Sequence, residues 1–90
     1  MHHRKERLES LIADLLSAEI VKNLETPDAL ITITGVEINE EAETATVLIS
    51  VFPDERKKDV IKGLKKIIPA LSFMLLKKMR IKKVPTLLFR

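Results

Sequence analysis

A long helical interval between two strand-like segments constrains this fold more than any other feature. Strand patterns at residues 44–52 and 84–89 are separated by more than thirty residues, in which apolar side chains recur at helical spacing. Such an interval is too long for a hairpin and suits a helical crossover on one face of a sheet. The chain is therefore predicted to fold as a sheet with helices packed against it.

The residues before this interval predict a helix followed by a hairpin. An amphipathic helix is expected over about residues 4–23, after which Thr26-Pro27-Asp28 interrupts the chain, because the residue before a proline avoids helical space. Residues 30–38 and 44–52 are rich in β-branched types and are predicted to be strands. The apolar positions of the helix are Leu8, Leu11, Ile12, Leu15, Leu16 and Ile20.

The first of the two strands contains an irregularity. Ile31 and Ile33 share one phase of the apolar alternation, whereas Val36 and Ile38 share the other. The slip falls at Gly35, which predicts a β-bulge or a strong bend at that position. The polar residues 39–43 then form the turn into the second strand.

The crossover interval predicts two helices separated by a proline. Asp54 is expected to cap the first helix, and Pro69 ends it because proline lacks a backbone N–H and its ring collides with the preceding turn. The second helix is predicted at about residues 70–79, and its broadly apolar surface implies burial. Pro85 cannot donate to a ladder, so the last strand is expected at a sheet edge or begins there.

The resulting order is helix, strand, strand, helix, helix, strand, an α+β fold with a small mixed sheet covered by helices. A length of 90 residues predicts one domain, residues 1–90. The chain has no cysteine, which excludes disulfides, cysteine-bound zinc and thiol catalysis. No apolar run approaches the roughly 20 residues that cross a bilayer, and no signal-type stretch is present. We therefore expect a soluble, cytoplasmic protein with no membrane partner.

The charges are distributed unevenly along the chain. Residues 1–53 carry 4 Lys/Arg and 10 Asp/Glu, a net charge of −6, whereas residues 54–90 carry 12 Lys/Arg and 3 Asp/Glu, a net charge of +9. No acidic residue follows Asp59, while nine Lys/Arg do. This asymmetry favours a polyanionic partner. The alternative, that the lysines only keep two helices soluble, stays open.

Three segments carry a family resemblance. They are Gly35-Val36-Glu37 at the first strand, Leu64–Ile68 before the helix break, and Lys77-Lys78-Met79-Arg80-Ile81, followed by Val84-Pro85 and Leu87…Phe89. With the order of elements, they resemble ribosome-binding factor A, a bacterial family of small-subunit assembly proteins. The resemblance covers nearly the whole chain and implies a type II KH-like fold. It also implies a protein that binds the small ribosomal subunit (30S) and its 16S rRNA precursor and aids late rRNA processing. A monomer without a cofactor is expected, and small-subunit ribosomal proteins are further candidate contacts.

Two departures from the family pattern matter. Members usually have an Ala-x-Gly kink between the crossover helices, where this chain has Ile67-Ile68-Pro69. A kink is still expected, because proline also interrupts a helix, although in a different way from glycine. The sequence also stops at Arg90, while many members continue into a polar tail, so contacts of that tail are not expected here.

The composition indicates how RNA would be recognised. The two glycines, Gly35 and Gly63, cannot supply the Gly-x-x-Gly loop of ordinary KH domains. Aromatic residues are 3% of the chain and all Phe; Phe52, Phe73 and Phe89 are expected in the core, which leaves little for base stacking. Recognition of the phosphate backbone by cations remains. The candidate RNA-binding residues are Lys62, Lys65, Lys66, Lys77, Lys78, Arg80, Lys82 and Lys83.

Arg80 is the strongest single candidate, because its guanidinium can grip a phosphate with two hydrogen bonds, which lysine cannot do. An ion pair or a carbonyl cap at the helix end is the structural alternative for this side chain.

Catalysis has weak support. His2 and His3 lack a patterned third ligand for a metal, and the adjacent Glu40, Glu41 and Glu43 suit a polar turn better than acid–base chemistry. The chain is therefore predicted to be a non-enzyme. Two alternatives remain open: a protein–protein interaction module or homodimer that uses the apolar first helix, and a binder of duplex DNA.

Overall fold

The computed structural model describes residues 4–23 and 28–90 and confirms the predicted order of elements. The first helix and the two long strands have the predicted bounds, whereas Thr26 and Pro27 lie outside the described residues. The elements are α1 (Arg4–Asn23), β1 (Leu30–Ile38), β2 (Thr44–Phe52), the 3₁₀ turn η1 (Asp54–Arg56), α2 (Lys57–Lys66), α3 (Ile68–Met79) and β3 (Thr86–Phe89).

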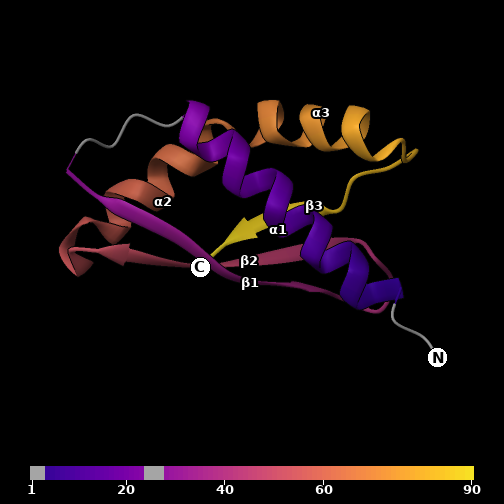
Figure 1. Cartoon of the computed structure of the whole chain (residues 1–90), viewed down its shortest axis with the longest axis horizontal. Coiled ribbons are helices and arrows are strands. Elements are labelled where there is room, and N and C mark those ends of the chain that lie inside the picture. Colours follow the sequence, from indigo (N-terminus) through magenta and orange to yellow (C-terminus); the bar gives the residue numbers. More distant parts are fainter. Residues whose placement is uncertain (1–3, 24–27) are drawn as a thin grey trace.

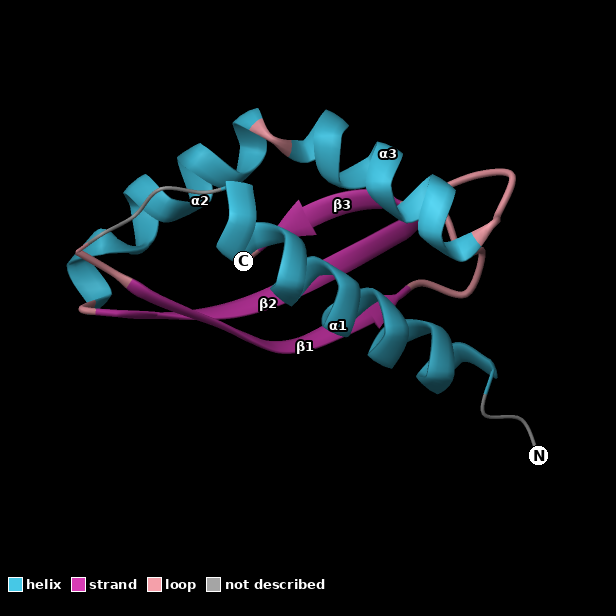
Figure 2. Cartoon of the chain, turned by 45° about the horizontal axis from the view of Figure 1, so that its top comes forward, coloured by secondary structure: helices cyan, strands magenta, loops and turns pink. Residues whose placement is uncertain are grey.

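The three strands form a mixed sheet with β2 at its centre. β1 pairs with β2 in antiparallel fashion and β3 pairs with β2 in parallel, so the predicted crossover is present. Figure 1 shows the three helices on one side of the sheet, and Figure 2 shows α2 and α3 as a bent arm. α1 packs on β1, while the arm contacts β2 and β3. The fold is therefore the predicted α+β arrangement, with one sheet face covered.

The slip in the alternation of β1 is a β-bulge. Ile33 faces Ile49 and Gly35 faces Leu48, so Thr34 is the extra residue. The Thr34 hydroxyl donates a hydrogen bond of 3.2 Å to the Leu48 carbonyl. The bulge turns Val36 and Ile38 toward the core, where both are buried.

The core lies between the sheet and the helices. One stripe of α1 is buried through Ile12, Leu16 and Ile20, because residues three and four apart share a helix face. Alternate residues of β2 are buried from the other side, as the period of two in a strand requires. The fully buried leucines Leu64 and Leu71 come from the crossover arm, and each such side chain contributes about 1.5–3 kcal/mol.

Two predictions about the helix ends need correction. Asp54 does not cap a helix: the chain leaves β2 through η1, which has Pro53 at its N-terminus and no side-chain cap. Pro69 does not precede the second helix but lies in its first turn. The first turn leaves its N–H groups unpaired in any case, so proline is tolerated there.

The prediction for the phenylalanines was right for one residue and wrong for two. Phe89 is buried under the arm, whereas Phe52 is 73% exposed and Phe73 is 61% exposed. Phe52 is the last residue of β2, opposite Leu30. Phe73 occupies the side of α3 that faces away from the sheet, opposite the buried Leu71 and Leu75.

Candidate nucleic-acid interface

The lysines of α2 lie on its solvent side. Val60 and Leu64 are buried in the core, and Lys62, Lys65 and Lys66 are exposed on the opposite side of the helix. This separation follows from the helical period, which gives apolar and charged residues different faces. We call these three lysines the α2 group.

A single residue joins the two helices of the arm. Ile67 follows the last residue of α2 and precedes the first residue of α3, with φ −102° and ψ 6°. Its N–H donates to the Leu64 carbonyl at 3.1 Å, and its carbonyl accepts from the Leu71 N–H at 2.9 Å. Both helix ends are therefore partly satisfied by the same residue. The predicted kink is present, and it places the α2 group and the basic end of α3 on one connected arm.

A second set of cations surrounds the end of α3. Lys77 and Lys78 are exposed in its last turn, where a cation is favoured by the helix dipole. Arg80, Lys82 and Lys83 follow and are also exposed. We call these five residues the α3-end group. All eight predicted RNA-binding residues are thus accessible, in two groups near the two ends of the 12-residue helix α3, which is about 18 Å long.

Arg80 has an unusual backbone conformation. It follows the last residue of α3 with φ 54° and ψ 40°, in the left-handed region that glycine and asparagine usually occupy. Within residues 4–23 and 28–90, its guanidinium has no hydrogen-bond or ion-pair partner. The ion-pair alternative raised by the sequence is therefore not realised among these residues, and the cation projects into solvent.

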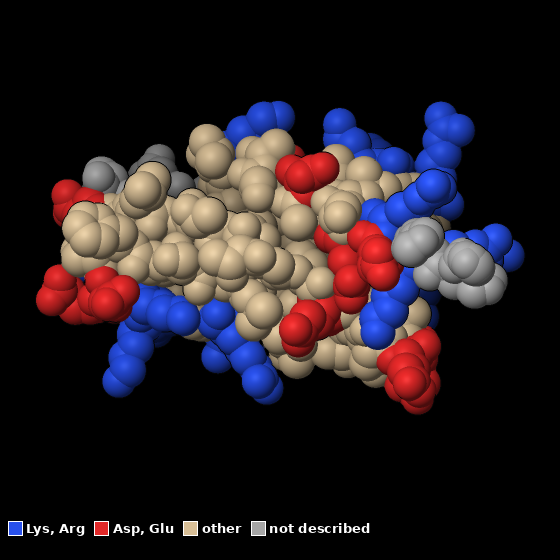
Figure 3. Space-filling view, turned by 60° about the horizontal axis from the view of Figure 1, so that its bottom comes forward, with Lys and Arg blue, Asp and Glu red and all other residues tan. Residues whose placement is uncertain are grey.

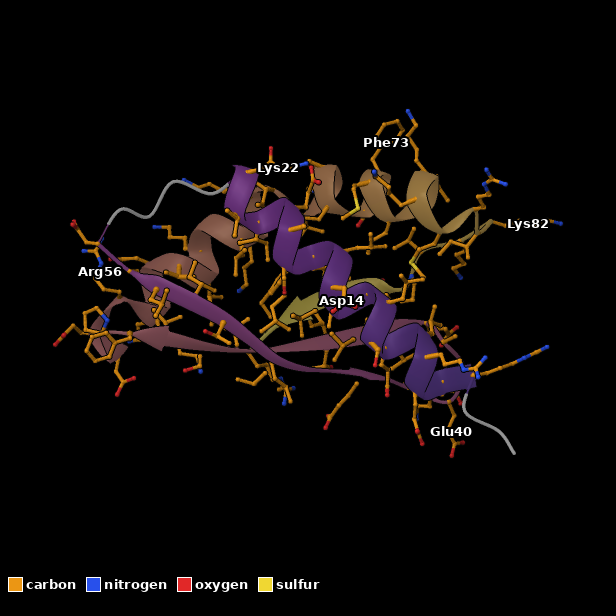
Figure 4. All side chains as sticks on the ribbon, viewed as in Figure 1. Asp14, Lys22, Glu40, Arg56, Phe73 and Lys82 are labelled. Carbon is orange, nitrogen blue, oxygen red and sulfur yellow. The ribbon has the colours of Figure 1, made fainter. Side chains whose placement is uncertain are left out.

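Acidic side chains gather on a different part of the molecule. A hollow of about 370 Å³ between α1 and β1 is lined by Glu6, Glu9 and Asp14 together with uncharged residues. Figure 4 places Asp14 on α1, and Lys82 beyond the end of α3. A hollow with this lining repels phosphate, so it is unsuited to RNA.

The uncovered face of the sheet is mostly uncharged. Leu30, Phe52 and Leu88 are exposed there, with threonines and a serine between them. Figure 3 shows a broad uncharged area in this view, with Lys and Arg at its margins. The residues of the α2 group and the α3-end group lie on, or directly after, the helices α2 and α3, which cover the other face of the sheet.

The catalytic and metal-binding possibilities gain no support. Glu40, Glu41 and Glu43 belong to the turn between β1 and β2, as predicted, where the Asn39 side-chain oxygen accepts hydrogen bonds from the N–H groups of Glu43 and Thr44. Among the described residues, no group of His, Asp and Glu could hold a metal ion, and His2 and His3 lie outside them. No helix in the described ranges has the length and apolar character of a membrane span.

The comparison with known proteins decides the family. The sequence model of ribosome-binding factor A matches residues 4–90. The chain belongs to the ribosome-binding factor A family. Relatives of that name in Geobacter metallireducens and Geobacter sulfurreducens are 30% and 33% identical, each over the whole chain and 78% of the relative.

Solved structures of ribosome-binding factor A have the same fold. The crystal structure from Thermus thermophilus has a TM-score of 0.83 and 25% identity, over 96% of this chain and 92% of that one. A homology model of the Thermus protein, fitted into a cryo-EM map of its complex with the 30S subunit, has a TM-score of 0.73 over 100% of this chain and 92% of that one. At 22% identity, this second match supports the fold alone.

The sequence reasoning missed Phe73 as a surface residue. The position of Phe73 in α3 indicated exposure. Phe73 shares a helix face with Pro69 and Lys77, each one turn away, and lies opposite Leu71 and Leu75, each two residues away. The apolar character of the whole helix concealed this signal.

Proposed function

We propose that this member of the ribosome-binding factor A family binds the small ribosomal subunit and its 16S rRNA precursor through the α2 and α3-end groups. The observation that carries the proposal is the exposure of all eight residues on, or directly after, α2 and α3, in a stretch of sequence without any acidic residue after Asp59. The name of the relatives supports the ribosome as partner, and the Thermus protein, 25% identical in its crystal structure, is the one described in a complex with the 30S subunit.

The contacts would be made mainly to phosphates. Lysine and arginine neutralise phosphates and release counterions, so binding weakens as salt increases. If roughly four to six phosphates are neutralised, the logarithm of affinity falls with the logarithm of salt concentration with a slope near −3 to −5. Such contacts position the protein on folded RNA without reading its sequence.

In this proposal the protein acts as a single-domain, monomeric, cytoplasmic binding factor and catalyses no reaction. It stabilises a conformation of the precursor in which late rRNA processing proceeds, and then dissociates. Most of the apolar stripe of α1, which could have formed a dimer contact, is packed within the same chain: Ile12, Leu16 and Ile20 are buried, and Leu11 is 44% exposed. Sedimentation of the purified protein tests the monomeric state.

Charge reversal tests the interface. The triple variant Lys77→Glu, Lys78→Glu and Arg80→Glu should lose co-sedimentation with small subunits while retaining its thermal unfolding transition, because all three side chains are exposed. A matched control exists at the start of α1, where reversing the exposed Arg4, Lys5 and Arg7 changes the net charge by the same amount.

The control should leave the association largely intact. If the α3-end variant still co-sediments with the salt dependence of the wild type, the RNA-binding residues are wrongly assigned. If both triple variants lose binding equally, net charge and not this interface governs the association.

A further inference from the structure

The outward side of α3 carries an apolar strip between the two basic groups. Pro69, Phe73 and Leu76 lie on this side, because residues three and four apart share a helix face. Phe73 is 61% exposed and Leu76 is 37% exposed, whereas Leu71 and Leu75 on the opposite side are fully buried. Packing within the described chain therefore does not explain the strip.

A neighbouring lysine contacts the phenylalanine ring. Lys77 lies one turn after Phe73, and its Nζ is 5.2 Å from the ring centroid, a cation–π geometry. Figure 4 shows Phe73 on α3, pointing away from the sheet. The structure thus presents an aromatic ring and a positive charge together to solvent.

The surrounding charges indicate the chemistry of the partner. Lys66 precedes the strip, and Lys77, Lys78 and Arg80 follow it, all of them exposed. A partner for this surface must be strongly anionic and must also offer a flat apolar face. Single-stranded nucleic acid has both features, because each phosphate is followed by a base with a π face.

We propose that Phe73 is a stacking platform for an unpaired base of the bound rRNA, while Lys77 and its basic neighbours contact the adjacent phosphates. This inference rests on the proposed function and adds that the RNA at α3 is single-stranded. Stacking on phenylalanine tolerates any base, so the contact selects unpaired RNA and not a sequence. It replaces the sequence-based expectation that the phenylalanines lie in the core and leave little for base stacking.

Conservative variants separate stacking from other roles of an exposed apolar residue. Phe73→Tyr retains an aromatic ring, while Phe73→Leu retains apolar bulk and loses the ring. The matched control is Phe52→Ala, since Phe52 is 73% exposed but lies at the end of β2. The probes are a short oligoadenylate and a blunt RNA duplex with the same number of phosphates, measured by fluorescence anisotropy at several KCl concentrations.

The expected result is specific to the ring and to single strands. Phe73→Leu should weaken oligoadenylate binding by about 5- to 150-fold, as loss of one base stack does. Phe73→Tyr and Phe52→Ala should bind like the wild type, and duplex binding should not change. The salt dependence of Phe73→Leu should equal that of the wild type, because the ring neutralises no phosphate.

Three results would overturn the inference. If Phe73→Leu binds oligoadenylate as well as the wild type, the ring is not a stacking platform, although the basic interface stands. If the variant loses whole small subunits but keeps oligoadenylate, the strip docks on a ribosomal protein. If the wild-type protein binds neither RNA, the proposed function itself fails. Thermal unfolding of each variant excludes misfolding as the cause.

Discussion

The carboxylate of Glu9 in α1 accepts a hydrogen bond of 2.8 Å from the backbone N–H of Ile38 at the end of β1. The N–H of the next residue, Asn39, donates to the Thr44 carbonyl across the hairpin. Because successive N–H groups of a strand point in opposite directions, the Ile38 N–H points away from β2, toward the open edge of the sheet. Glu9 therefore joins α1 to β1 through two residues that are 29 positions apart in the sequence, and it accepts from an N–H group on the edge strand.

Removing this carboxylate should destabilise the fold. Glu9→Ala leaves a half-buried N–H without its acceptor and should lower the free energy of unfolding by about 1–3 kcal/mol. Glu9→Gln keeps a carbonyl oxygen and should lose less. Urea denaturation measures both variants, with the exposed turn residue Glu40→Ala as control. If Glu9→Ala is as stable as the control, the hydrogen bond does not hold α1 to the sheet.

Local pattern was sufficient to predict most of the elements. The bounds of α1, β1 and β2 follow from the period of apolar residues, and the bulge follows from the change of phase at Gly35. The kink followed from Pro69, but the exact junction at Ile67 did not, because proline is tolerated in the first turn of a helix.

The surface properties were harder to predict because they depend on tertiary packing. Phe73 is the same residue type as the buried Phe89, but Phe73 lies on the outward side of α3, whereas Phe89 points from β3 into the core. The left-handed conformation of Arg80 was equally hard to predict, because glycine, and not arginine, is the residue that usually indicates it. The positions of the lysines were predictable, because charged residues remain exposed in almost any fold.

Gly35 is expected to tolerate alanine despite its place in the bulge. Its φ is not in the positive region, and a Cβ at this position would lie 3.8 Å from Leu48 Cδ1, an ordinary van der Waals distance. Gly35→Ala should therefore raise the free energy of unfolding by about 0.4–1 kcal/mol, because alanine restricts the unfolded chain. Urea denaturation measures the change. A loss of stability would mean that the bulge needs a conformation that alanine cannot adopt.

Arg80→Gly should separate stability from binding. A residue other than glycine in the left-handed region costs about 1–2 kcal/mol, so the glycine variant should be more stable by about 1 kcal/mol. The same change removes a cation from the α3-end group. Binding to an rRNA fragment should therefore weaken, and the magnitude of the salt slope should fall by about 1.

Ala42→Gly is the matched control, because Ala42 also has a positive φ, 57°, but lies in the turn between β1 and β2. It should gain similar stability and leave RNA binding unchanged. Urea denaturation and anisotropy titrations over a range of KCl measure both variants. If Arg80→Gly is less stable than the wild type, the arginine side chain contributes to the fold. If it gains stability and binds RNA as well as Ala42→Gly does, Arg80 is not an RNA-binding residue, and the strain at this position has another cause.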